Sequence, residues 1–284
     1  MIEFPNSSMP QWTAEEINAR LGISTAIYQK SQLSARHIAE IRESGITRIE
    51  LSIITGSLDH RNCRQVTEIL NECQKQSVTV VGVHGPFKLP YNSEDEEERK
   101  IVVRESLSAI RFAEEAGASI YVAHFGCGKN SKETVMELLN QIDGFRIKLT
   151  TENGRDLQDY MAVVDDIGSD RFGITVDIGH TIDSDGINPF VKKENARQTL
   201  AQCGNRVFHI HLHEIFNLEQ KADHRPPLHQ DGIAEWGEIF AALKEINYRR
   251  EFVFEDGRGE NPEEWIQMTA AFPKAFVKRY GNDK

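Results

Sequence analysis

Short apolar runs rich in β-branched residues alternate along the chain with longer amphipathic stretches. Each run predicts a buried strand, and each amphipathic stretch predicts a helix. In residues 34–45, for example, Ile38 and Ile41 fall on one helical face and Gly45 follows as a stop signal. The predicted strands are residues 22–28, 48–53, 78–84, 119–124, 146–152, 172–177, 207–213 and 251–255.

This order of strands and helices indicates one α/β domain. Strands separated by crossovers of a dozen or more residues form parallel sheets, and eight such units favour closure into a single (β/α)8 TIM barrel. No G-x-G-x-x-G motif follows the first predicted strand, which disfavours a dinucleotide-binding fold. We expect the barrel to span residues 21–284. Residues 1–20 are interpreted as a short N-terminal extension, in which Thr13 and Glu16 resemble a capping box.

Polar residues occupy one particular position in the last six predicted strands. Each of these strands has an apolar body and carries a His, Asp or Glu at or near its C-terminal end, and active sites of barrel enzymes are built at that end. Taken singly, such a residue is more often structural, but six together favour a site. The six residues are His84, His124, Glu152, Asp177, His211 and Glu255.

The chemistry of these six residues points to a divalent metal. Carboxylates and imidazoles are its usual ligands, and three clustered carboxylates would repel one another without a cation. In the run VFHIHLHE (207–214), period two places His209, His211 and His213 on one face of the strand. Phe208, Ile210 and Leu212 are expected on the other face. The segment DIGH adds His180 just after a glycine.

Composition narrows the possible partners. The 284 residues carry a formal charge of −11, which argues against a surface built to hold nucleic acid or an anionic membrane. Four cysteines without a C-x-x-C pair indicate reduced thiols. No signal-peptide pattern and no apolar run of about 20 residues is present. We therefore expect a cytoplasmic protein, with a homo-oligomer left open and neither nucleic acid nor membrane as partner.

The motifs at these positions resemble the xylose-isomerase-like barrel superfamily, which contains sugar isomerases and epimerases and the apurinic endonucleases. The resemblance runs from about residue 22 to residue 270. No single motif is specific, but their order and spacing together are. The matching segments are VHGPF (83–87), AHFG (123–126), TEN (151–153), DIGH (177–180), HIHLHE (209–214), DGIAEW (231–236) and VFE (253–255).

The resemblance implies roles for individual residues. It puts the shared metal site on Glu152, Asp177, His211 and Glu255. His84 and His124 match positions that join the equivalent of Glu152 around a second metal in the endonucleases. His180 matches a ligand of a third metal there, or a group that binds a substrate hydroxyl in the epimerases. It also implies that His209 is a packed barrel residue and that His213 lies behind the ligands or faces substrate.

One loop departs from the endonuclease pattern. Members of that branch complete the third metal with an Asp-x-His pair, whereas residues 221–232 here read KADHRPPLHQDG. Asp223 and His224 are adjacent, and Arg225 stands where the histidine would fall. His224 and Arg225 are therefore candidate substrate-binding residues, since an arginine would suit an anionic or polyhydroxyl substrate. A surface role for Arg225 is an equal alternative.

The resulting hypothesis is an enzyme, a metal-dependent isomerase or epimerase of a sugar, sugar phosphate or related polyol ketone. Proton transfer next to a metal-bound carbonyl would use Glu152 and Glu255 as the acid and base. Glu50 is expected either to touch a substrate hydroxyl or to lie exposed. Three carboxylates and one imidazole suit Mn²⁺, Mg²⁺ or Co²⁺, with Zn²⁺ as an alternative.

Two alternatives remain at this point. A zinc-dependent phosphodiester hydrolase resembling the apurinic endonucleases is favoured by His84 and His124 and opposed by the altered Asp-x-His and the acidic balance. A non-catalytic barrel that binds metal or sugar is opposed by the complete ligand set, although fold alone does not determine function.

Overall fold

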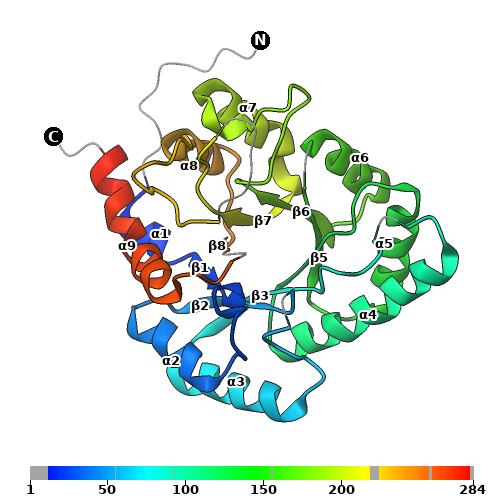
Figure 1. Ribbon diagram of the computed structural model, residues 1–284. Coiled ribbons are helices and arrows are strands. Elements are labelled where there is room, and N and C mark those ends of the chain that lie inside the picture. Colours follow the sequence, from blue (N-terminus) through cyan, green and yellow to red (C-terminus); the bar gives the residue numbers. More distant parts are fainter. Residues whose placement is uncertain are drawn as a thin grey trace.

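The computed structural model describes residues 12–54, 56–91, 93–154, 156–217, 224–255 and 258–281. Within them, eight parallel strands pair in sequence order and close into a barrel, because β1 pairs with both β2 and β8. The predicted TIM barrel is confirmed (Figure 1). The strands are β1 (Leu21–Ser24), β2 (Arg48–Ser52), β3 (Thr79–His84), β4 (Ile120–Ala123), β5 (Lys148–Glu152), β6 (Phe172–Asp177), β7 (Val207–Leu212) and β8 (Phe252–Phe254).

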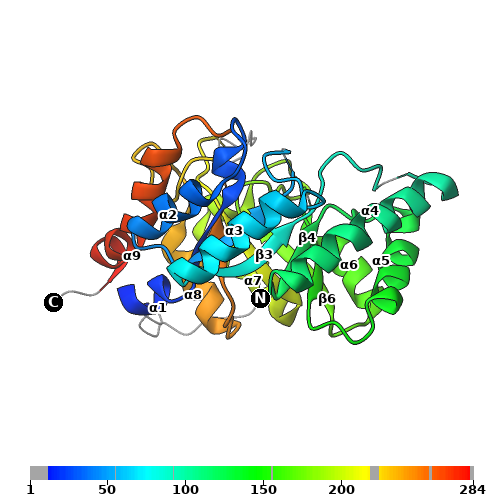
Figure 2. The same cartoon turned by 90° about the horizontal axis from the view of Figure 1, so that it is seen from below.

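Helices surround the barrel, as Figures 1 and 2 show from two directions. The apolar side chains of these helices pack on the outward-facing residues of the strands and form the main core. The helices are α1 (Ala14–Asn18), α2 (Ala35–Glu43), α3 (Cys63–Gln76), α4 (Glu96–Glu115), α5 (Lys129–Gln141), α6 (Leu157–Ile167), α7 (Lys193–Cys203), α8 (Trp236–Glu245) and α9 (Pro262–Tyr280), with the 3₁₀ helices η1 (Thr25–Tyr28), η2 (Pro189–Val191) and η3 (Gly204–Arg206).

Seven of the eight predicted strands are shorter in the structure by one or more residues, and two of them show why. The strand expected at 22–28 ends at Ser24, where η1 begins, because Ser24 Oγ accepts the backbone N–H of Ala26 at 3.4 Å. This bond caps the short helix and competes with the sheet ladder. The strand expected at 146–152 begins only at Lys148. The backbone N–H groups of Arg146 and Ile147 donate instead to the carboxylate of Glu114, at 3.2 and 3.1 Å.

Phe208 lies on a different face from the one predicted. The register between β6 and β7 shifts, so that Ile174 pairs with Val207 and Thr175 with His209, which leaves Phe208 as an extra residue. It turns into the amino-terminal end of the barrel, packing with Ile120 and Val122 in a cluster separate from the main core. The reason is a β-bulge, which overrides strict alternation. Gly173 provides the space for the Phe208 ring, because a Cβ at residue 173 would lie 2.4 Å from that ring.

The N-terminal segment from residue 12 packs against the barrel. The predicted capping box is present, with Thr13 N donating to Glu16 Oε2 at 2.8 Å and Glu16 N donating to Thr13 Oγ1 at 3.1 Å. Trp12 is 4% exposed and its indole N–H donates to Phe240 O at 2.6 Å. Residues 1–11 of the expected extension lie outside the described residues.

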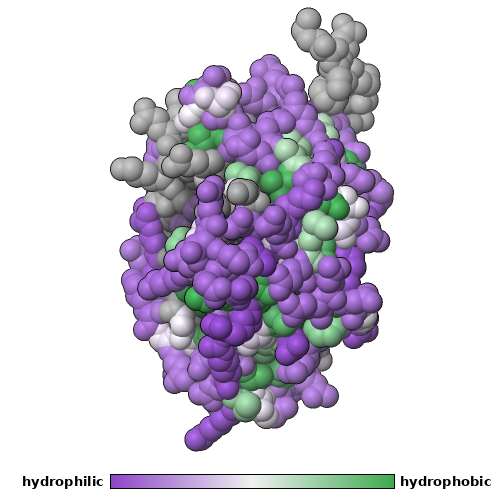
Figure 3. All heavy atoms as spheres, turned by 90° about the vertical axis from the view of Figure 1, so that its right-hand side faces the viewer, coloured by the Kyte–Doolittle hydropathy of each residue, from purple (hydrophilic) through white to green (hydrophobic). Residues whose placement is uncertain are grey.

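The face that carries α4 and α5 is mostly hydrophilic, with hydrophobic residues scattered over it (Figure 3). Ile101 and Met136, 38% and 45% exposed, are the large apolar side chains exposed on these two helices. No helix within the described ranges is both long enough and apolar enough to cross a membrane.

Candidate metal centre

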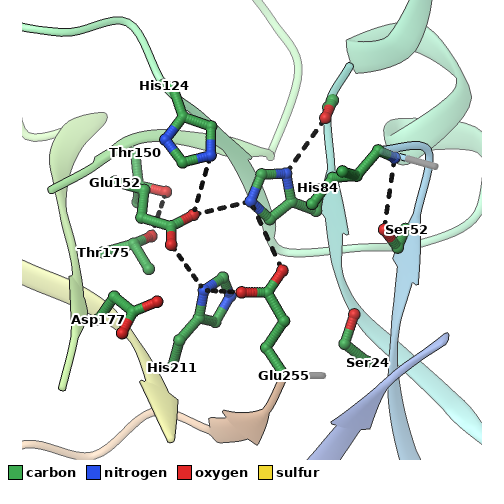
Figure 4. Close-up of polar contacts among 12 residues, drawn as sticks. Ser24, Ser52, His84, His124, Thr150, Glu152, Thr175, Asp177, His211 and Glu255 are labelled. Atoms are coloured by element: carbon green, nitrogen blue, oxygen red, sulfur yellow. Dashed lines mark hydrogen bonds and ion pairs between the residues drawn. The ribbon is translucent and has the colours of Figure 1, made fainter. Parts of the chain in front are cut away.

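The structure brings the six strand-end residues together at one end of the barrel (Figure 4). They come from β3 to β8, whose carboxyl ends all face the same side because the strands are parallel. His84, Glu152 and Asp177 are the last residues of their strands, and His124 and Glu255 directly follow theirs. His211 is the next-to-last residue of β7.

Four of these side chains form one tight group. Each contributes one ligand atom, and the four atoms all lie within 4.8 Å of one another. His211 Nδ1 lies 3.3 Å from Glu152 Oε1 and 3.4 Å from Glu255 Oε2. The exposed fractions are 4% or less for all four residues, so little water reaches the charges. The group consists of Glu152, Asp177, His211 and Glu255.

Two atoms in this group lack the hydrogen bonds that buried polar atoms require. His211 Nδ1 and Asp177 Oδ2 are buried and have no hydrogen-bond partner among the described residues. Buried polar atoms without a partner are uncommon in folded proteins, and a bound ion is one explanation for them. A divalent cation would satisfy both and neutralise the carboxylates. The residues present therefore fit a metal ion.

The pKa directions show how strongly the group needs positive charge. Burial raises the pKa of Glu255 to about 7. Burial also opposes ionisation of Glu152, but the neighbouring His211 and His124 lower its pKa well below the usual range. Burial alone would lower the pKa of His84, yet its hydrogen bond to Glu152 and the nearby carboxylate charges raise it to about 9. The clustered carboxylates therefore favour positive charge among them, which a metal ion would supply.

A buried carboxylate sets the orientation of His211. Glu50 in β2 is fully buried, and its Oε2 lies 3.1 Å from His211 Nε2 and 3.1 Å from His209 Nε2. With Nε2–H donating to Glu50, a neutral His211 ring keeps the lone pair of Nδ1 for a metal. Glu50 is fully buried, so the alternative that it lies exposed is wrong. Its contact with a substrate hydroxyl stays a prediction.

We predict that Glu50→Gln weakens metal binding about 10-fold to 100-fold, the range found for partners that orient a histidine ligand. Gln keeps the size of the side chain but offers only one acceptor oxygen to the two imidazoles. Titration calorimetry with Mn²⁺ would measure the change. Glu251→Gln, in a partly exposed residue just before β8, is the control. An unchanged dissociation constant in Glu50→Gln would contradict this role.

His84 and His124 form a second group around the other oxygen of Glu152. His84 Nε2 lies 2.7 Å from Glu152 Oε2, and His124 Nε2 lies 3.7 Å from the same atom. Burial lowers the pKa of His124 to about 4, which leaves its ring neutral. Phe87, 56% exposed, meets His124 edge-on at 5.1 Å between ring centroids. The sequence motif VHGPF contains Phe87, but its place at the mouth of the site was not predicted.

A third group consists of three histidines. His180 Nε2 lies 3.1 Å from His224 Nε2, and the His213 and His224 rings stack at 4.6 Å between centroids. Burial lowers the pKa of His224 to about 3. His213 Nε2 also lies 2.6 Å from Asp177 Oδ1, so this histidine supports a member of the four-residue group. Period two in β7 indicated the face of His213, but nothing local indicated that His224 would meet it.

Other contacts hold Asp177 and Arg225. The backbone N–H of His180 donates to Asp177 Oδ1 at 2.9 Å, and the backbone N–H of Asp177 donates to Asn153 Oδ1 at 2.9 Å. The guanidinium of Arg225 lies over the ring of Phe216, 4.8 Å from its centroid. Asp223 and the rest of residues 218–223 lie outside the described residues.

Comparison with known proteins places this geometry in a family. An uncharacterized protein of Methanocaldococcus jannaschii is 25% identical over 255 residues, which cover 82% of this chain and 82% of that protein. The crystal structure of D-psicose 3-epimerase with D-tagatose from Clostridium cellulolyticum H10 matches with a TM-score of 0.70 and 14% identity, covering 92% of this chain and 99% of that one. The IolI protein with a binding zinc atom matches with a TM-score of 0.70 and 16% identity, covering 92% and 98%.

The match to a family model is more extensive than any single motif. The model described as xylose isomerase-like TIM barrel matches residues 38–275, from α2 into α9. It therefore includes seven of the eight strands and every residue of the three groups described above. The chain belongs to the xylose isomerase-like TIM barrel family.

Proposed function

We propose that this protein is a divalent-metal-dependent isomerase or epimerase of a sugar, a sugar phosphate or a related polyol ketone. One observation carries the proposal. Glu152 and Glu255 come from β5 and β8, which are not neighbours in the barrel, yet their carboxylates flank the same His211 nitrogen at 3.3 and 3.4 Å. Two carboxylates placed this way can act on two faces of one substrate carbon. The epimerase among the structural matches supports the reaction class, and the IolI protein with its zinc atom supports a metal site in this fold.

Glu152, Asp177, His211 and Glu255 would hold the metal. Three carboxylates and one imidazole favour Mn²⁺, Mg²⁺ or Co²⁺, with Zn²⁺ as the alternative. When bound, such an ion acts as a Lewis acid that makes a proton next to the substrate carbonyl acidic enough to transfer.

Different residues would transfer the proton, hold the ligand Asp177 in place and contact the substrate. One of Glu152 and Glu255 removes the proton and the other returns one to the opposite face, in an order that depends on the substrate's stereochemistry. His213 and the backbone N–H of His180 hold Asp177 in place. His180, His224 and Arg225 belong to the loops that follow β6 and β7, where they would meet the hydroxyl or phosphate groups of the substrate.

The direct test is incubation of the Mn²⁺-loaded protein with a panel of ketoses and inososes in D₂O. Deuterium next to the carbonyl of the recovered sugar, together with a product of inverted or isomerised configuration, is the expected result. Mass spectrometry and NMR measure both. A complete panel without exchange, under conditions in which the metal is bound, would contradict the proposal.

A second candidate function, phosphodiester hydrolysis, is favoured by the group of His84 and His124 around Glu152. Metal content separates the candidates, and we predict one Mn, Mg or Co ion per chain after purification without chelators. Two or more zinc ions, together with efficient incision of an abasic DNA duplex that is lost in His84→Ala, would favour the hydrolase. No bound metal after reconstitution would favour a non-catalytic barrel. Elemental analysis by plasma mass spectrometry provides the count.

A further inference from the structure

Glu214 is a buried carboxylate that none of the three histidine and carboxylate groups includes. It lies two residues beyond the end of β7 and is 1% exposed. Its Oε1 accepts the backbone N–H groups of Ile215 and Ala234, both at 3.0 Å. Its Oε2 accepts the backbone N–H of Leu228 at 2.9 Å and the indole N–H of Trp236 at 2.7 Å. One side chain therefore binds both ends of the β7–α8 connection.

The four donors match an ionised carboxylate and no other side chain of this size. A carboxylate offers two oxygens with about four acceptor positions, whereas a glutamine would turn an NH₂ group toward two of the N–H donors. The backbone also closes tightly around the group. A Cβ at Gly232 would lie 2.1 Å from Glu214 Cδ, so only glycine permits this approach.

The β7–α8 connection, which Glu214 binds, contains residues with strained backbone. His224 and Leu228 have φ values of 49° and 64°, in the left-handed region that non-glycine residues rarely adopt. Such strain persists only where surrounding contacts impose it, and it gathers at functional sites. Glu214 supplies such contacts, since its side chain accepts the N–H of Leu228 and its own N–H donates to Arg225 O at 2.8 Å.

The strained segment carries His224, whose side chain lies beside the candidate metal centre. The His224 ring ends 3.1 Å from His180 Nε2, and His180 in turn lies 3.9 Å from Asp177 Oδ2 through the same nitrogen. We infer that Glu214 is a positioning residue, which anchors the described parts of the β7–α8 connection so that His224 and Arg225 face the substrate. The part concerning substrate rests on the proposed function, whereas the anchoring does not.

Hydrogen–deuterium exchange of the metal-loaded protein tests the anchoring. In Glu214→Gln, the amides of Leu228 and Ala234 should exchange about tenfold faster, because charged hydrogen bonds to buried N–H groups are lost. Modification of His224 by diethyl pyrocarbonate, followed by mass spectrometry, should accelerate to a similar extent. The amides of β5 and β6 report whether the barrel stays folded. Glu235→Gln, in the partly buried residue before α8, is the matched control.

A second, milder variant keeps the inference testable if Glu214→Gln does not fold. Trp236→Phe removes one donor and leaves the carboxylate and its three backbone bonds, so it should loosen the segment to a smaller degree. Unchanged exchange at Leu228 and Ala234 in both variants, or unchanged His224 labelling, would overturn the inference. This result is independent of whether any ketose is turned over.

Steady-state kinetics on a ketose found in the panel test the link to substrate. We expect Glu214→Gln to raise KM about tenfold with a smaller change in kcat, since ground-state and transition-state contacts from the loop are lost together. Glu214→Gln and His224→Ala should also be non-additive in a double-mutant cycle. Additive effects, or a loss confined to kcat, would show that Glu214 does not act through His224. If no ketose reacts, the proposed function fails, and exchange and labelling still decide the anchoring.

Discussion

Replacement of Glu152 or Glu255 by glutamine is expected to lower proton exchange between substrate and solvent by about 10²-fold to 10⁴-fold, the usual contribution of general acid–base catalysis. Glutamine has the size of glutamate and keeps one oxygen as a metal ligand, but it cannot accept or return a proton. Both residues should show the effect, because an epimerisation needs a group on each face of the carbon. Deuterium incorporation into recovered ketose, measured by mass spectrometry, gives the rate.

Glu152 and Glu255 both belong to the four-residue group, so either substitution could also release the metal. Loss of the metal would lower the exchange rate just as loss of the acid or base would. The exchange rate is therefore measured at saturating Mn²⁺, with the metal content of each variant determined in parallel. Glu133→Gln, in an exposed residue of α5, serves as the control. If either variant keeps its metal and a near wild-type exchange rate, that residue is not part of the acid–base pair.

Asp177→Asn is expected to weaken metal binding by more than the factor of about 10 to 100 that loss of an orienting partner costs, because a direct ligand and its charge are changed. The neutral amide offers one oxygen in place of two, and its NH₂ group would point either at the metal or at the surrounding donors. One such donor is the His180 N–H, 2.9 Å from Asp177 Oδ1, and His213 Nε2 lies 2.6 Å from the same atom.

Competition between the protein and a fluorescent chelator for Mn²⁺ measures this change. Asp143→Asn, in an exposed residue of the turn after α5, provides the matched control. Thermal unfolding of the metal-free variant separates a binding defect from a folding defect. Wild-type affinity in Asp177→Asn would show that this aspartate is not a ligand and that the ion lies nearer to His84 and His124.

The placement of the strand-end residues could be predicted because it follows from periodicity and strand direction. Parallel strands joined by helical crossovers must all end on the same side of the sheet, so a carboxylate at the end of β5 and another at the end of β6 approach each other. Strand direction alone was therefore enough to predict that Glu152 and Asp177 lie close together. Alternation in β7 likewise placed His211 and His213 on the face opposite Ile210 and Leu212, which lie in the main core.

Contacts that depend on barrel closure and on loop backbone could not be predicted. Glu50 and His211 are 161 residues apart in the chain, and their hydrogen bond forms because closure of the barrel lets side chains of β2 and β7 meet in its interior. The sequence showed Glu50 only as a polar residue in an apolar strand. The bulge that turns Phe208 inward depends in the same way on a register shift between two strands.

The sequence by itself thus determined the eightfold repeat, the end of the barrel that holds the site and the residues that gather there. Those features depend on local periodicity and on parallel strand direction. The tertiary structure alone decided that Glu50 supports His211, that His224 meets His180 and His213, and that Glu214 anchors the segment that carries His224. These contacts join residues far apart in the chain, and they depend on barrel closure and on left-handed backbone that no local pattern encodes.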